Sequence, residues 1–135
     1  MIAKHMLASS GFAILAALCL AFPAAAQSDP GKEVSTAANH AGLAAKAADL
    51  KGVQMHLHHV VNCLVGPKDS NFDQAAGNPC NGQGDGAIAD TSDAAKKKPL
   101  QDALKQAQDG LKATDMAAAQ KQATMAQETL SKPAM

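Results

Sequence analysis

The sequence predicts an all-α protein, an up-down four-helix bundle made of two repeated helical hairpins with a long disulfide-braced loop between them. Three observations predict this class. Four segments carry apolar residues at helical spacing. Residues 66–95, between the second and third segments, are rich in Gly, Asn, Asp and Pro, which is typical of loops. The two halves of the chain also match when shifted by 66 residues.

The first 26 residues predict a secretory signal peptide. Lys4 gives a short positive region, residues 7–21 are almost continuously apolar, and residues 23–26 are the small kind that a signal peptidase requires. An uncleaved anchor is the alternative, although the apolar stretch is short for a membrane span. We therefore expect a periplasmic or secreted protein that is free of the membrane after cleavage, with a single domain over residues 27–135.

The first hairpin is predicted over residues 32–48 and 50–65. The apolar positions of its first helix are Val34, Ala38, Ala41, Ala45 and Ala48. Those of its second helix are Val53, Leu57, Val60 and Leu64. Asp49 stands where a helix N-cap is needed, and Gly66-Pro67 should end the second helix.

The second hairpin is predicted to begin at Pro99, which suits a first helical turn, and to restart after Thr114 as an N-cap. Its apolar positions are Leu100, Ala103, Leu104, Ala107, Leu111, Met116, Ala119, Ala123, Ala126 and Leu130. Because Ala is small, we expect Ala41 and Ala107 to lie at close helix–helix contacts.

The repeat concerns both the turns and the apolar pattern. Lys46-Ala47-x-Asp49 falls on Lys112-Ala113-x-Asp115, and Leu64 falls on Leu130. Alanine-rich sequence can produce matches by chance, but agreement of the turn motif with the apolar positions favours a duplicated hairpin.

Two cysteines remain after removal of the signal peptide, Cys63 and Cys80. In an oxidising compartment such a pair predicts one disulfide, and chain entropy suggests about 3 kcal/mol of stabilisation for this loop length. The alternative is that Cys63 is a thiolate metal ligand beside His59.

Four histidines also remain, namely His40, His56, His58 and His59. At about 100° per residue, His56 and His59 lie on one flank of the second helix, and His58 lies on the opposite flank. His40 lies on the matching flank of the first helix, so an antiparallel pair can bring it to His56 and His59. A bundle of the opposite hand would instead separate them.

Imidazole binds copper and zinc well, so we predict a divalent metal site at His40, His56 and His59, with His58 as an accessory or second-site ligand. The alternatives are a polar helix flank, or haem or another cofactor. We expect no haem, because the chain has no C-x-x-C-H motif and only three aromatic residues, all Phe.

Three segments resemble the periplasmic small metal-binding proteins of bacteria: NHAGLAAKA, VQMHLHHVVNCL and QDALKQAQDGLKATDMAAAQKQATMAQETL. The resemblance implies a four-helix bundle that handles copper and other divalent metals. This chain has fewer His than such proteins, with Gln106, Gln120 and Gln122 where they often place His, and it adds the Cys63–Cys80 loop. It therefore implies one or two metal sites rather than high-capacity buffering.

Composition excludes other classes. The net charge is zero and Arg is absent, so we expect no nucleic-acid partner. No nucleophile–base pattern is visible, so we expect no enzyme.

The segment Asn81-x-Gln83-x-Asp85-Gly86 outlines a calcium loop, but Ser92 stands where a Glu ligand belongs, which favours a solvated surface loop. The alternative to metal binding is a structural or interaction module whose braced loop contacts a periplasmic protein.

Overall fold

A computed structural model describes residues 27–132, which form helices and loops without any strand. The four long helices are α1 (Pro30–Lys46), α2 (Leu50–Val65), α4 (Ala94–Lys112) and α5 (Met116–Ser131). A short 3₁₀ helix, η1 (Gln74–Ala76), and a short helix α3 (Ala87–Asp90) lie between α2 and α4. The predicted signal peptide lies outside the described residues. Across residues 27–132, every helix is too short or too polar to cross a membrane.

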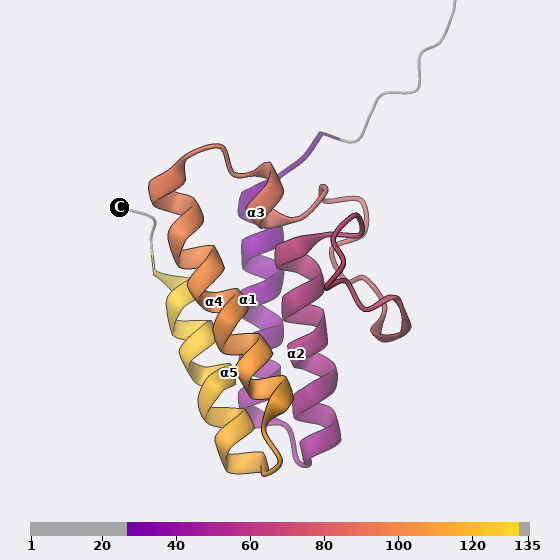
Figure 1. Cartoon of the computed structure of the whole chain (residues 1–135), viewed down its shortest axis with the longest axis vertical. Coiled ribbons are helices and arrows are strands. Elements are labelled where there is room, and N and C mark those ends of the chain that lie inside the picture. Colours follow the sequence, from indigo (N-terminus) through magenta and orange to yellow (C-terminus); the bar gives the residue numbers. More distant parts are fainter. Residues whose placement is uncertain (1–26, 133–135) are drawn as a thin grey trace, which may run out of the picture.

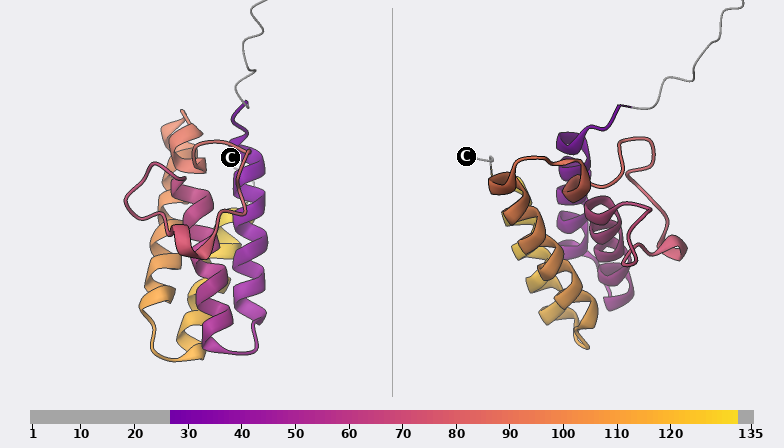
Figure 2. Two further views of the ribbon diagram at one scale, coloured as in Figure 1. Left: turned by 90° about the vertical axis from the view of Figure 1, so that its right-hand side faces the viewer. Right: turned by 45° about the horizontal axis from the view of Figure 1, so that its top comes forward.

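The long helices lie side by side, and the connection between the two hairpins crosses one end of the molecule (Figure 1). The tight turns that join α1 to α2 and α4 to α5 lie together at the opposite end. Helix α1 packs against α2 and α5, and α4 packs against α5 and α2. Residues 66–86 lie over the face that α1 and α2 share, away from α5 (Figure 2). This overlying segment forms one wall of the candidate site described below.

Aspartate side chains begin each long helix. The Asp29 carboxylate accepts from the Lys32 N–H at 3.0 Å, and Asp49 accepts from the Gly52 N–H at 2.7 Å, which confirms the predicted Asp49 cap. The cap of α5 is Asp115 rather than Thr114, and it accepts from the Ala118 N–H at 2.9 Å. Asp115 is the residue onto which the 66-residue shift places Asp49, so both tight turns use the same kind of cap.

Alanine is the commonest residue of the core. The predicted α2 positions Val53, Leu57, Val60 and Leu64 are all buried, and Leu57 and Leu64 are the largest fully buried side chains. In α1 the buried apolar side chains are Ala37, Ala41 and Ala44, while the predicted Val34, Ala38 and Ala45 are only partly buried. The predicted Ala48 lies beyond the end of α1 and is exposed. With so many alanines, apolarity alone does not fix the rotation of α1 about its axis. Ala41 and Ala107 are fully buried, as expected of close contacts.

The segment expected to be loop over residues 66–95 contains more helix than predicted. Besides η1 and α3, α4 begins at Ala94, where the Asp93 side chain accepts from the Ala95 N–H at 2.8 Å. Pro99 therefore lies inside α4 rather than in its first turn. The residues before it, Ala94 to Lys98, are good helix formers, and this preference together with the Asp93 cap extends the helix by more than one turn.

Candidate metal centre

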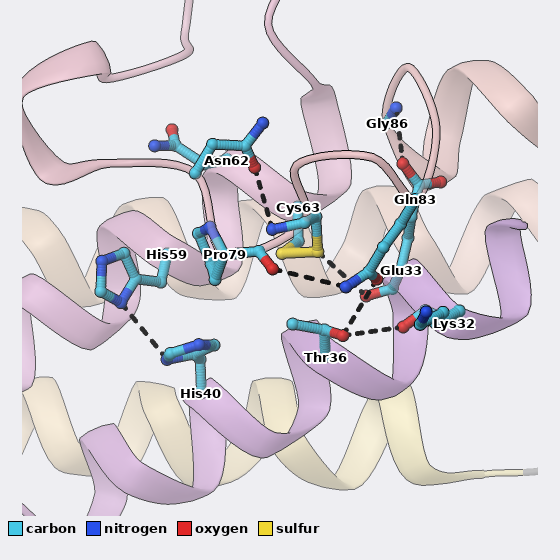
Figure 3. Close-up of a disulfide and its surroundings, with 12 residues drawn as sticks. Lys32, Glu33, Thr36, His40, His59, Asn62, Cys63, Pro79, Gln83 and Gly86 are labelled. Carbon is cyan, nitrogen blue, oxygen red and sulfur yellow. Dashed lines mark hydrogen bonds between the residues drawn. A yellow bond between two sulfur atoms is a disulfide. The ribbon is translucent and has the colours of Figure 1, made fainter. Parts of the chain in front are cut away.

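Three histidines from two helices converge beneath the loop. His40 of α1 faces His56 and His59 of α2, and Figure 3 shows the contact between His40 and His59. The Nδ1 atom of His40 lies 3.2 Å from Nδ1 of His56 and 3.3 Å from Nδ1 of His59. One ring nitrogen from each of the three residues lies within 4.8 Å of the other two. The bundle therefore has the hand that brings the predicted trio together.

The loop supplies a hydrogen bond to the outer side of this cluster. Nε2 of His59 lies 2.8 Å from the carbonyl oxygen of Ala76 in η1. A carbonyl oxygen can only accept, so Nε2 of His59 carries the proton. In the neutral ring the Nδ1 atom then presents a lone pair toward Nδ1 of His40.

Burial keeps the rings of His40 and His56 neutral. It lowers the pKa of His40 to about 4, and the neighbouring rings of His59 and His56 add to this effect. Burial, followed by the charge of His59, also lowers the pKa of His56. Neutral imidazole is the form that binds metal ions, so near pH 7 the lone pairs of these two residues are available.

The remaining predicted site residues lie outside the cluster. Cys63 and Cys80 form the predicted disulfide, with their Cα atoms 5.3 Å apart. The alternative of Cys63 as a thiolate ligand is therefore wrong, because its sulfur is already bonded to Cys80. His58 lies on the other flank of α2, where its Nδ1 is 3.1 Å from a carboxylate oxygen of Asp73. It is not among the three converging histidines.

The calcium-like segment does not form a comparable cluster. The side chain of Gln83 accepts a hydrogen bond from the Thr36 hydroxyl at 3.1 Å, and Asp85 pairs with Lys68 at 2.6 Å. Among residues 27–132, the three histidines are the one group of His, Cys, Asp or Glu close enough to hold a metal ion. A groove of about 1030 Å³ lies elsewhere, between α1, α4 and α5, and no histidine lines it.

Two contributors to the site were missed from the sequence. Asn62 is fully buried between His59 and Cys63, and it hydrogen-bonds to the loop. Ala76 supplies the carbonyl group to His59. An Asn within the apolar stretch that ends α2 is a signal that could have identified the first of them, because a buried amide requires partners. No local signal identifies Ala76, since its contact depends on the path of the loop.

Comparison with known proteins identifies no relative of this chain. No protein-family model, no curated protein and no solved structure matches the chain. The case for a function therefore rests on the site residues themselves.

Proposed function

We propose that the protein binds a divalent transition metal ion of the copper or zinc kind through Nδ1 of His40, His56 and His59. The observation that carries this proposal is the close approach of His40 Nδ1 to Nδ1 of His56 and of His59, with one ring nitrogen of each of the three residues within 4.8 Å of the other two. In a tetrahedral site with Zn–N bonds of about 2.0–2.1 Å, two ligand nitrogens are about 3.3 Å apart. The His40–His56 and His40–His59 distances are 3.2 and 3.3 Å. The rings are thus placed close to metal-binding geometry before an ion binds.

Hydrogen bonding among the rings explains the arrangement less well. His59 has its proton on Nε2, so its Nδ1 can only accept. The Nδ1 atom of His40 lies close to the Nδ1 atoms of both His56 and His59. If His40 carries a proton on Nδ1, that single N–H can make a well-aligned hydrogen bond to only one of them. A single proton on His40 therefore leaves at least one of the neighbouring Nδ1 lone pairs without a well-aligned hydrogen bond. A metal ion at their centre would satisfy all three at once.

The ligand set favours particular ions. Imidazole nitrogens suit copper, zinc and nickel, whereas magnesium and calcium prefer oxygen ligands. Three protein ligands leave a fourth position for water or for a ligand supplied by a partner. We propose binding rather than catalysis, because the sequence offers no nucleophile–base pattern beside the three imidazoles.

The proposal includes the cellular setting predicted from the sequence. In it, an up-down bundle of two repeated hairpins carries one metal site and is exported by the signal peptide of residues 1–26. The Cys63–Cys80 disulfide supports this setting, since disulfides persist in oxidising compartments. The protein would act in the manner of the periplasmic small metal-binding proteins, with a capacity of about one ion per chain.

The test is calorimetric titration of residues 27–135 with Zn²⁺ and Cu²⁺. We expect saturable binding that weakens by more than about 100-fold in the variant His56→Ala/His59→Ala. Removing a group that only hydrogen-bonds to a metal ligand costs about 10- to 100-fold in affinity, and this variant removes two of the ligands themselves. The matched control is Met55→Ala, an exposed position of the same helix outside the cluster, which should bind like the parent. Parent binding weaker than millimolar, or equal binding by the double variant, would overturn the proposal.

A further inference from the structure

Asn62 is an unusual residue at its position. It is fully buried among apolar neighbours near the end of α2, and every hydrogen-bonding group of its side chain is used. Its Nδ2 donates to the carbonyl oxygens of Asp73 and Gly77, both at 2.7 Å. Its Oδ1 accepts from the Asp73 N–H at 2.8 Å. A buried amide that is this fully bonded holds its partners firmly, because separating them would leave buried polar groups unpaired.

These bonds enclose η1 from both sides. Asp73 immediately precedes η1, and its carboxylate accepts from the N–H groups of Ala75 at 2.9 Å and Ala76 at 3.3 Å. Gly77 immediately follows η1, with φ of 85°, a conformation that favours glycine. Asn62 therefore fixes the turn at its start and at its end, and the Ala76 carbonyl lies between these points.

The neighbouring disulfide fixes the same loop at another point. Cys63 follows Asn62 on α2 and is bonded to Cys80, close to the loop residues shown in Figure 3. The disulfide restrains the loop near residue 80, whereas Asn62 restrains residues 73–77, which carry the contact to His59. The two anchors therefore have different roles, and the amide is the one that holds the loop residues on both sides of Ala76.

We propose that Asn62 is a positioning residue of the metal centre: it holds η1 against α2 so that the Ala76 carbonyl keeps the His59 ring oriented with Nδ1 toward His40. This inference rests on the proposed metal-binding function. A histidine that ligates a metal commonly donates its other ring N–H to a carbonyl or carboxylate, which fixes the tautomer and the ring orientation. Here the main chain of the loop supplies that partner, and Asn62 sets its place.

The orientation of the His59 ring can be measured in the metal-free protein. With Ala76 in place, His59 should hold its proton on Nε2. ¹⁵N chemical shifts of the ring nitrogens report which nitrogen is protonated. In Asn62→Leu, which keeps the size of the side chain but removes its hydrogen bonds, we expect His59 to become a mixture of both tautomers.

The metal-binding experiment uses the same variant. We expect the Zn²⁺ affinity of Asn62→Leu to fall by about 10- to 100-fold, with helix content retained by circular dichroism. Asn71→Leu is the matched control, since Asn71 is an exposed loop residue that bonds only to Asp69 in the described structure. It should leave both the His59 tautomer and the affinity unchanged. If Asn62→Leu fails to fold, Asn62→Ser replaces it, because the shorter polar side chain lacks the amide that donates to both the Asp73 and the Gly77 carbonyl oxygens.

The outcomes separate the two proposals. Loss of the His59 tautomer together with weaker Zn²⁺ binding supports the positioning role. An unchanged tautomer, or a changed tautomer with unchanged affinity, overturns it while leaving metal binding intact. If the parent binds neither Zn²⁺ nor Cu²⁺, the proposed function fails, and with it the positioning role in a metal centre, whatever the tautomer measurement shows.

Discussion

Replacing Glu33 with Gln should make the stability of the protein less sensitive to alkali. Glu33 lies in α1, is 1% exposed, and accepts a hydrogen bond from the Gly86 N–H at 2.9 Å through Oε1. Its Oε2 is buried and has no hydrogen-bond partner. Burial raises the pKa of Glu33 to about 7, and the Asp90 and Asp85 carboxylates add to the rise, while the Gly86 N–H opposes it.

The direction of the pH effect follows from where the proton is held. The ordinary pKa of 4.5 applies to the unfolded chain, so between pH 4.5 and about 7 the native state binds more protons than the unfolded state. Stability from this group is therefore present at low pH and is lost as the pH rises through 7. At about 1.4 kcal/mol for each tenfold change in the ionisation constant, the loss is at most about 3 kcal/mol.

His40 acts in the opposite direction. Its pKa falls from 6.5 to about 4, so the unfolded ring takes up a proton over this range while the native ring does not. Its contribution to stability is present above 6.5 and is lost as the pH falls toward 4. The parent and Glu33→Gln share this effect, so the difference between them isolates Glu33.

The assay is urea unfolding of both proteins at pH 4.5 and pH 8 with a chelator present. The stability of Glu33→Gln relative to the parent should rise between these pH values by up to about 3 kcal/mol, because the Gln amide is neutral throughout. Glu128→Gln, at an exposed position of α5, is the matched control and should show no such rise. A relative stability of Glu33→Gln that is independent of pH would refute the reasoning.

Three further predictions concern the core, the disulfide and the cluster. Ala107 is fully buried, so Ala107→Leu should overpack the bundle and cost about 1–3 kcal/mol; an unchanged thermal melting curve would contradict this. Mass spectrometry of the non-reduced protein should show Cys63 and Cys80 bonded, with a mass about two hydrogens below the dithiol form; two thiols open to alkylation would contradict it. In the metal-free protein, NMR titration should place the pKa of His40 near 4; a midpoint at 6.5 would mean that burial does not keep this ring neutral.

Features that depend on local periodicity were predictable from the sequence. The α2 stripe around Leu57, the Asp49 cap and the shared flank of His56 and His59 follow from the angular spacing of residues on a helix. The pairing of Cys63 with Cys80 followed from their number and the predicted compartment.

Features that depend on tertiary packing were not predictable in this way. The hand of the bundle decides whether His40 meets α2, and both hands fit the same apolar pattern. The predicted rotation of α1 about its axis differs from the observed one, because Ala37 and Ala38 are equally apolar in the sequence although only Ala37 is fully buried. Glu33 appears as an ordinary surface residue in the sequence, and the path of the loop through Gly86 buries it.

The most direct test of the central claim is a Zn²⁺ titration of ¹⁵N-labelled protein followed through the histidine ring nitrogens. We expect saturation at one ion per chain, with coordination shifts at Nδ1 of His40, His56 and His59. The ring of His58, which faces Asp73, should keep its metal-free shifts. Coordination through Nε2, participation of His58 in place of one of the three, or the absence of saturable shifts would contradict it.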